Sequence, residues 1–232
     1  MFNLLKVEFY KLKKFQLGYI AILFMVVVGY LYGDNRIGNK VFEMTDNTAI
    51  AFSHVVSDNS FVFIIAIVTA LFMGKDFSNR TICNEIKLGY SRFHILFSRT
   101  VMVCVFAVLL HVIYIISVIV GFSVVRGFDT SLFSSENTLW LLTVLLQLVA
   151  TICGVVLISF LVKKASEATV LSALYCVICC NILRNFISPT ACFYFVEDNT
   201  PENIGSAIVS AFIAMIVFLV IAVITFNKAE VK

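Results

Sequence analysis

Charged residues are scarce in this 232-residue chain: they make up 13% of the sequence, against 61% for hydrophobic residues. A soluble globular protein carries roughly 25% charged residues, because its surface has to face water. The shortage therefore excludes an ordinary soluble domain, and the mean hydropathy of +1.01 agrees. With only two prolines and ten glycines, the chain is also neither collagen-like nor a low-complexity disordered polymer. The composition predicts an all-α integral membrane protein.

Several motifs that carry chemistry are missing as well. The chain has no Walker-type phosphate loop, no H-E-x-x-H zinc motif and no G-x-S-x-G nucleophile elbow. We therefore expect no catalytic, cofactor-binding or metal-binding residues, and an enzyme acting inside the membrane is the weakest of the functional classes considered. The seven cysteines lie mostly in apolar runs, which favours small buried side chains over disulfides. Lysines that follow the membrane edge rather than a groove give no reason to expect a nucleic acid partner.

Six apolar runs indicate membrane-spanning helices, each of which needs about 20 residues to cross the hydrocarbon layer. The second run is short, so we expect its helix to begin near Val55 and to include Asp58 at its outer end. The sequence thus predicts a single transmembrane domain over residues 1–232, with spans at about 15–32, 55–74, 99–122, 139–162, 168–186 and 205–226.

The distribution of basic residues predicts the orientation. With the N-terminus in the cytosol, Arg36, Lys40, Arg126 and Arg184 are the only basic residues outside. The inner segments then hold the other 13 of the 17, and cytoplasmic segments carry such an excess. Both termini are predicted to be cytosolic. The inner basic residues are Lys6, Lys11, Lys13, Lys14, Lys75, Arg80, Lys87, Arg92, Arg99, Lys163, Lys164, Lys228 and Lys232.

Residues 1–14 repeat apolar side chains at helical spacing, at Phe2, Leu5, Phe9 and Leu12. Such a stripe predicts an amphipathic helix that lies in the headgroup layer with its lysines toward anionic lipid. A solvated basic leader that only sets the topology is the alternative.

The connection between the second and third spans also has the features of a short helix. Ser78 or Asn79 can cap it, Gly89 can end it, and Ile82 and Ile86 share one face. The pattern predicts an amphipathic helix over about 78–89 that another protein can bind, although an ordinary interfacial linker would look similar.

This connection reads Asp76-Phe77-Ser78-Asn79-x-Thr81-Ile82-x-Asn84-Glu85, followed by Gly89-x-Ser91-Arg92. It resembles the loop after the second span in ABC-2 type permeases, and most closely the small six-span subunits of bacterial exporters for lantibiotics and bacitracin-like antibiotics. The opening segment 4–14 is also similar to the start of that family. Arg80 and Cys83 depart from it, since relatives commonly have glycine and arginine there.

The resemblance implies a function and a set of partners. The helix over 78–89 would be the coupling helix that docks on a dimer of cytosolic ATPase subunits, which would hold ATP and Mg. A second permease subunit would complete an exporter for amphipathic antimicrobial peptides in the bacterial plasma membrane. Residues 187–204 would form either a re-entrant cap or an interfacial aromatic belt. The residues expected to couple the permease to the ATPase are Asp76, Phe77, Asn79, Thr81, Ile82, Glu85, Ile86 and Arg92.

Three polar residues fall inside the predicted spans, namely His111, Gln147 and Asn181. Polar groups in hydrocarbon need a partner or a wet cavity. They either line a translocation path or form hydrogen bonds between helices, and the second role is the more common one. A non-transport assembly or sensor subunit, binding a cytosolic partner through residues 76–91, is the alternative function.

Overall fold

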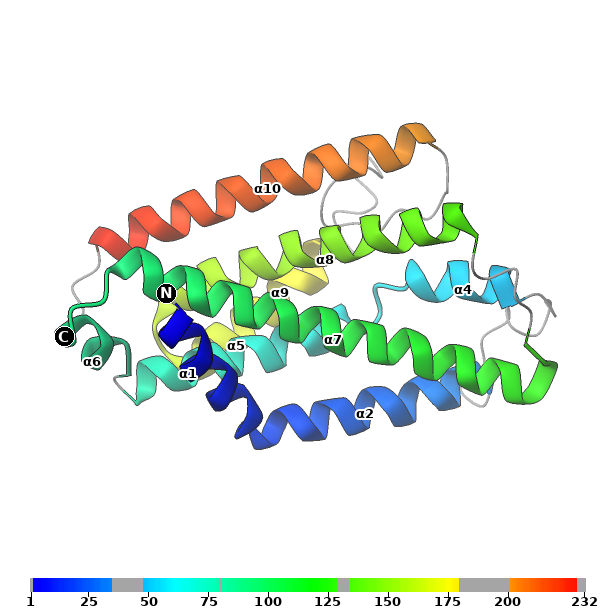
Figure 1. Cartoon of the computed structure of the whole chain (residues 1–232), viewed down its shortest axis with the longest axis horizontal. Helices are drawn as coiled ribbons and strands as arrows, with labels where there is room; N and C mark the ends of the chain where they lie inside the picture. Colours follow the sequence, from blue (N-terminus) through cyan, green and yellow to red (C-terminus); the bar gives the residue numbers. More distant parts are fainter. Residues whose placement is uncertain (1, 35–47, 80, 129–133, 180–200, 229–232) are drawn as a thin grey trace.

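The computed structural model describes residues 2–34, 48–79, 81–128, 134–179 and 201–228, and within these ranges it contains helices and no strands. Figure 1 shows an elongated bundle in which α1, α6 and the last turn of α10 lie at the same end. We call this the α6 end. The helices are α1 (Phe2–Lys13), α2 (Gln16–Gly33), α4 (Thr48–Val56), α5 (Val62–Ser78), α6 (Thr81–Lys87), α7 (Arg92–Arg126), α8 (Ser135–Val162), α9 (Ala165–Val177) and α10 (Pro201–Lys228).

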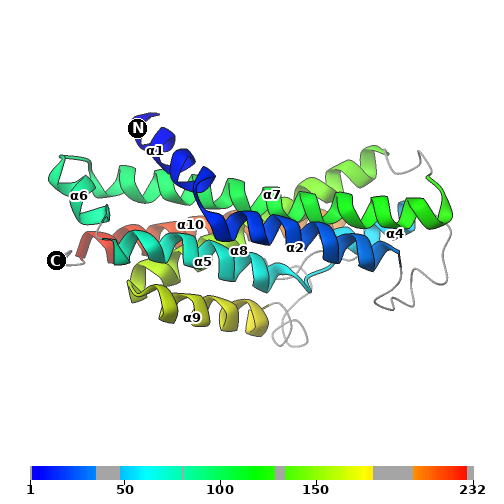
Figure 2. The ribbon, with the colours of Figure 1, turned by 90° about the horizontal axis from the view of Figure 1, so that it is seen from below.

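The long helix α7 runs the length of the bundle, and the other helices pack around it. α2 lies along one side of α7, α8 packs between α7 and α10, and α5 lies between α7 and α9 (Figures 1 and 2). The interior is an apolar core that includes Met25, Ile65 and Leu110. The outward faces of α2 and α10 are apolar as well. An apolar exterior suits a bundle whose solvent is lipid.

Within the described residues, four helices are long and apolar enough to cross a membrane: α2, α7, α8 and α10. A fifth span results if α5 and α6, which are bent by 56° against each other, are counted together. α9 is apolar but has only 13 residues, which is short of the roughly 20 that a crossing needs. The predicted span 168–186 runs on into residues outside the described ranges.

The predicted second span, 55–74, is not one helix. α4 ends at Val56, and α5 begins only at Val62. Between them the Asp58 carboxylate accepts a hydrogen bond from the Ser60 backbone N–H at 2.8 Å and another from the Tyr114 hydroxyl at 2.8 Å. Short polar side chains that bond to nearby backbone compete with helical hydrogen bonds. The polar run 57–60 therefore interrupts the helix, although hydropathy alone favoured a continuous one.

Glycines let α2 and α7 approach each other closely. Gly29 and Gly33 are four residues apart on the buried face of α2, and a Cβ at Gly33 would meet the Val118 carbonyl oxygen. On α7, a Cβ at Gly121 would meet the carbonyl oxygen of Tyr30. Small residues at i and i+4 are the usual means by which membrane helices pack backbone to backbone.

α6 is shorter than the predicted helix 78–89. Ser78 is the last residue of α5, where its hydroxyl donates to the Gly74 carbonyl at 3.2 Å. The end of α6 follows the expected pattern, because Gly89 has φ +88° and donates its N–H to Ile86, while the N–H of Tyr90 reaches the Glu85 carbonyl. This pair of bonds is a Schellman motif, which glycine accommodates without strain.

α1 covers residues 2–13, close to the predicted 1–14, and the apolar stripe of this helix was expected to face the membrane rather than the protein. Among the side chains of this helix that the structure describes, Leu4 and Glu8 are buried, whereas Phe9 is 62% exposed. Packing against α7 therefore uses one face of α1, and the Phe9 side points away from the rest of the protein.

Candidate functional site: a buried charge cluster at the α6 end

Five charged side chains from four helices meet at the α6 end, and we call them the α6 cluster: Glu8, Lys11, Asp76, Glu85 and Arg99. Arg99 is fully buried at its centre. Its Nε donates to Asp76 Oδ2 at 2.8 Å, and its Nη2 donates to Glu85 Oε2 at 3.0 Å. Lys11 Nζ lies 2.7 Å from Glu8 Oε1. The cluster thus links α1, α5, α6 and α7 through side chains alone.

The guanidinium of Arg99 suits this position because its donors are arranged in a rigid fork. Two separate nitrogens reach two separate carboxylates, one at the end of α5 and one in α6. Lys11 adds a second cation, at 3.2 Å from Asp76 Oδ1 and 3.3 Å from Glu85 Oε1. Moving a charged side chain out of water costs several kcal/mol, so charges remain buried only when they are paired in this way.

The cluster has three carboxylates and two cations, so it carries one negative charge in excess when all are ionised. Among the described residues, Glu8 Oε2 and Arg99 Nη1 are buried without a hydrogen-bond partner. Burial raises the pKa of Glu8 above 4.5; Arg99 opposes this and the Asp76 charge adds to it. Burial lowers the pKa of Lys11, but the Asp76 and Glu8 carboxylates outweigh it and raise that pKa. The Glu8 carboxylate therefore takes up a proton at a higher pH than an ordinary glutamate does, because its pKa is raised.

Replacing Glu8 with glutamine is expected to stabilise the protein at neutral pH, since glutamine imitates the protonated acid that the site prefers. A raised folded-state pKa gives stability that is complete below pH 4.5 and is lost as the pH rises through the folded value. The difference in thermal unfolding midpoint between the variant and the wild type should therefore be largest near pH 8 and shrink toward pH 4.5. The control is Glu167→Gln, which replaces an exposed carboxylate at the α6 end. Its difference in unfolding midpoint from the wild type should not change with pH in this way. If the Glu8→Gln variant were less stable than the wild type at pH 8, the raised pKa of Glu8 would be contradicted.

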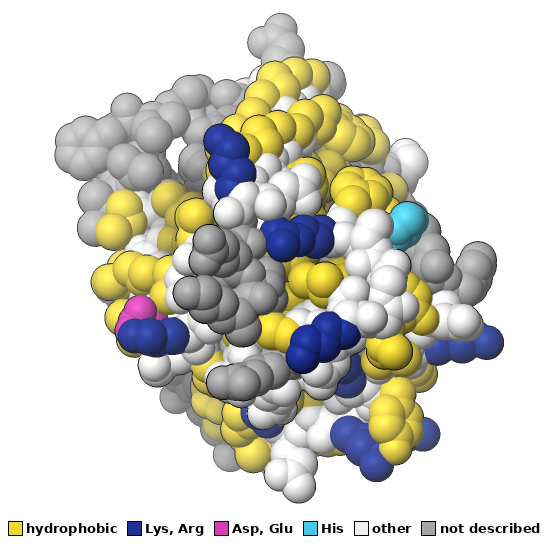
Figure 3. All heavy atoms as spheres, turned by 90° about the vertical axis from the view of Figure 1, so that its left-hand side faces the viewer, with side chains coloured by type: hydrophobic (Ala, Val, Ile, Leu, Met, Phe, Trp, Pro, Cys, Tyr) yellow, Lys and Arg dark blue, Asp and Glu magenta, His cyan; other side chains and the backbone are white. Residues whose placement is uncertain are grey.

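The two faces of α6 have different surroundings. Ile82 and Glu85 are buried, and Ile86 packs against the apolar core, so the Ile82/Ile86 face points into the bundle. Asn84, Lys87 and Leu88 are exposed, and Leu88 is 76% accessible. Figure 3 looks onto this end and shows Lys and Arg side chains with little acidic surface between them, because the carboxylates of the α6 cluster lie inside. The available edge of α6 is therefore Asn84, Lys87 and Leu88.

The remaining expected coupling residues also lie at this end. Phe77 packs edge-on against Phe160 of α8, with ring centroids 5.3 Å apart. Asn79 and Thr81 line a pocket beside α1. Arg92 donates from Nη1 to the carbonyl oxygens of Phe226 at 2.7 Å and Asn227 at 2.9 Å, which are otherwise open acceptors at the end of α10.

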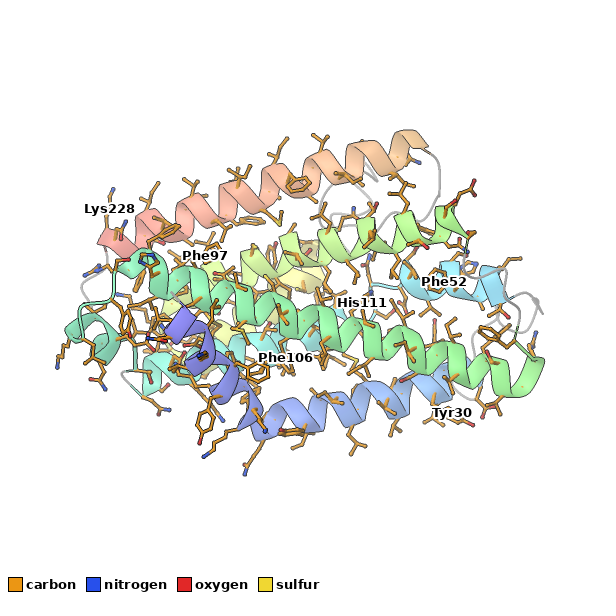
Figure 4. All side chains as sticks on the ribbon, in the orientation of Figure 1. Tyr30, Phe52, Phe97, Phe106, His111 and Lys228 are labelled. Carbon is orange, nitrogen blue, oxygen red and sulfur yellow. The ribbon has the colours of Figure 1, made fainter. Side chains whose placement is uncertain are left out.

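Two of the three polar residues expected inside the membrane are buried within the bundle. His111 on α7 is 1% exposed and lies near the middle of that helix (Figure 4), with its ring centroid 6.4 Å from that of Tyr114. Gln147 on α8 is fully buried. Asn181 lies outside the described residues. For His111 or Gln147 to line a path, the surrounding helices would have to part.

Sequence reasoning missed Glu8, Lys11 and Arg99 as members of a site. Each was counted only toward the basic or acidic balance of the inner side. The available signal was local: Glu8 and Lys11 are three residues apart on one helix face, and Arg99 follows Arg92 by seven residues inside an apolar run. Neither pattern indicates which acids Arg99 meets, 14 and 23 residues earlier in the chain.

Within the described ranges, no group of three or more His, Cys, Asp or Glu side chains could hold a metal ion. Cys104, Cys153 and Cys176 are buried, Cys83 and Cys179 are partly buried, and none of these five side chains forms a disulfide.

The sequence model of the ABC-2 family of transporter proteins matches residues 4–181, which is more than half of the chain. No curated protein and no solved structure matches. Members of this family are typically non-catalytic membrane subunits of ABC transporters that associate with an ABC ATPase. The chain, with several helices of membrane-spanning length, belongs to the ABC-2 transporter family and is a multi-pass membrane permease.

Proposed function

We propose that this permease is the membrane subunit of an ATP-driven exporter and that α6 is the helix through which its ATPase acts. The observation that carries the proposal is the two-sided build of α6. Its exposed edge, Asn84, Lys87 and Leu88, is available to a partner, while Glu85 on its inner face is bound to Arg99 of α7.

The α6 cluster offers a route for force. A displacement of α6 would act on Arg99 through Glu85, and on α5 because Asp76 shares the same guanidinium. Lys11 would carry it to α1, and Arg92, at the start of α7, holds the end of α10. Close-packed interiors resist compression and so transmit such strain. Motion of one short helix would thereby reach the helices that form the bundle.

The proposed assembly has two permease subunits, identical or related, and two ATPase subunits that hold ATP and Mg. The basic excess on the inner segments supports an orientation with both termini and α6 in the cytosol. In this topology the chain would cross the plasma membrane six times, with α5 and α9 as the two short spans. A partner ATPase would meet the exposed edge of α6 at the end of the bundle that Figure 3 shows.

The proposed cargo is an amphipathic antimicrobial peptide or peptide antibiotic, exported to protect the cell that makes or meets it. The support is the resemblance of residues 4–14 and 76–92 to permeases of lantibiotic and bacitracin-type exporters. Family membership itself extends only to a transporter permease. Reconstituted transport with candidate peptides is the measurement that assigns the cargo.

The test of coupling targets the exposed edge of α6. A Lys87→Glu/Leu88→Glu variant should reduce copurification with the partner ABC ATPase by at least about tenfold, since hot-spot residues at the centre of an interface are worth about 2 kcal/mol or more. Its own thermal unfolding midpoint should match the wild type, because both side chains are exposed. Stimulation of ATPase activity should fall in parallel.

The matched control is Lys163→Glu/Lys164→Glu, which places two acidic residues in the exposed connection between α8 and α9. It should bind and stimulate the ATPase as the wild type does. Full binding and full stimulation by the Lys87→Glu/Leu88→Glu variant would exclude α6 as the coupling helix. Binding without transport would instead favour the alternative of an assembly or sensor subunit.

A further inference from the structure

Two pockets lie on either side of the joint between α1 and α2. The first has a volume of about 270 Å³, and its lining includes Lys11, Lys14, Lys75 and Asn79. The second has a volume of about 330 Å³ and lies between α1, α2 and α7, with a mainly apolar lining that includes Leu12, Ile22, Phe106 and Leu109. We call them the head pocket and the tail groove.

Phe15 joins the two pockets, since it lines both of them. It is the residue that precedes α2, the first helix of membrane-spanning length, so the joint is where the chain enters the apolar layer. Its ring packs edge-on against Phe106, with centroids 6.5 Å apart, and Figure 4 shows Phe106 on α7 near this joint. A polar pocket and an apolar groove therefore meet at the depth at which a lipid changes from headgroup to chain.

The head pocket contains lysines whose charge is not neutralised by a carboxylate. Lys14 Nζ lies 4.7 Å from the Tyr10 ring centroid, and Lys75 Nζ lies 4.9 Å from that of Phe15. Among the described residues, neither lysine forms an ion pair. The one acid in the lining, Asp76, is already bound by Arg99 at 2.8 Å and by Lys11 at 3.2 Å. The free charge facing this pocket is therefore cationic.

We propose that the head pocket and the tail groove together bind one anionic phospholipid. Its phosphate lies between Lys14 and Lys75, and one acyl chain lies in the groove against Phe106 and Leu109. Basic pockets between membrane helices bind anionic headgroups, and aromatic and aliphatic walls accommodate the chain. The lipid would fix α1 to α2, α5 and α7 beside the α6 cluster. The inference needs only the membrane location of the bundle and not the coupling role of α6.

The test uses the purified full chain in mixed micelles that contain phosphatidylglycerol or phosphatidylcholine, with lipid retention measured by native mass spectrometry. Wild type should retain phosphatidylglycerol preferentially. Lys14→Gln/Lys75→Gln should lose roughly 30-fold in apparent affinity, since one lysine near an anionic lipid is worth about a factor of five. Leu109→Trp keeps every charge but fills the groove, and should also abolish the preference.

The control is Lys163→Gln/Lys164→Gln, which removes two exposed lysines from the α6 end outside either pocket and should retain the lipid as wild type does. Equal loss in this control would overturn the proposal in favour of general surface charge. Equal retention of the two lipids by wild type would also overturn it. Inorganic phosphate that displaces the lipid completely, with no effect of Leu109→Trp, would show a phosphate site in place of a lipid site. If the double lysine variant fails to fold, Leu109→Trp decides the question.

Discussion

Arg99→Met is expected to lower the thermal unfolding midpoint by roughly 10 °C. Removing one partner from a buried ion pair costs about 3–5 kcal/mol, and each kcal/mol shifts the midpoint of a chain of this size by about 2–4 °C. Without Arg99, three buried carboxylates would share only Lys11. The measurement is thermal unfolding of the purified protein in detergent, followed by the loss of the monodisperse peak in size-exclusion chromatography.

Compensating substitutions separate the loss of charge pairing from a general defect in α7. Adding Asp76→Asn and Glu85→Gln to Arg99→Met leaves only the Glu8–Lys11 pair, and should recover more than half of the lost stability. Buried ion pairs can be replaced by neutral groups at little cost when both partners go. If Arg99→Met alone were as stable as the wild type, the cluster would not be holding the four helices together.

Gly121→Leu is expected to separate α2 from α7, to lower the unfolding midpoint and to reduce the yield of folded protein. A side chain there would meet the backbone carbonyl of Tyr30, which cannot move without displacing α2. Overpacking of a closed interface usually costs about 1–3 kcal/mol, and a backbone obstacle puts this site at the upper end. The yield of monodisperse protein and its unfolding midpoint report the effect.

Gly205→Leu is the matched control, because a Cβ at Gly205 in α10 meets nothing within 4 Å. It should express and unfold as the wild type does. Wild-type behaviour of Gly121→Leu would show that the close approach of α2 and α7 is not required for the fold.

Hydropathy located most of the helices correctly. The runs predicted at 15–32, 99–122, 139–162 and 205–226 each lie within a helix or differ from one by a residue. Gly89 was also recognisable as the end of the short helix, because glycine readily adopts the positive φ that helix ends often need, and its φ here is +88°. These features depend on neighbours a few residues away, and such information is present in the order of the residues.

The interruption at Asp58 was harder to foresee. An apolar run of the required length favoured a continuous span, and a single carboxylate at its outer end was compatible with one. The break becomes evident only with the Tyr114 hydroxyl 2.8 Å from that carboxylate, a partner 56 residues later in the chain. A local pattern could show that residues 57–60 were able to leave the helix, but not that anything would hold them there.

The orientation of α6 was undetermined for a related reason. The Ile82/Ile86 face of an amphipathic helix can pack on lipid, on a partner or on its own bundle, and periodicity is identical in the three cases. In the structure the Ile82/Ile86 face packs against the bundle, and Asn84, Lys87 and Leu88 remain accessible. Contact residues for an ATPase are therefore better sought there than at Ile82.

The order of residues by itself determined that lipid is the solvent and where the long helices run, because in hydrocarbon each helix must satisfy its own backbone hydrogen bonds. Only the tertiary structure decided that Glu8, Asp76 and Glu85 share one arginine. That pairing depends on how four helices are rotated and placed against one another, and no spacing along the chain encodes those rotations.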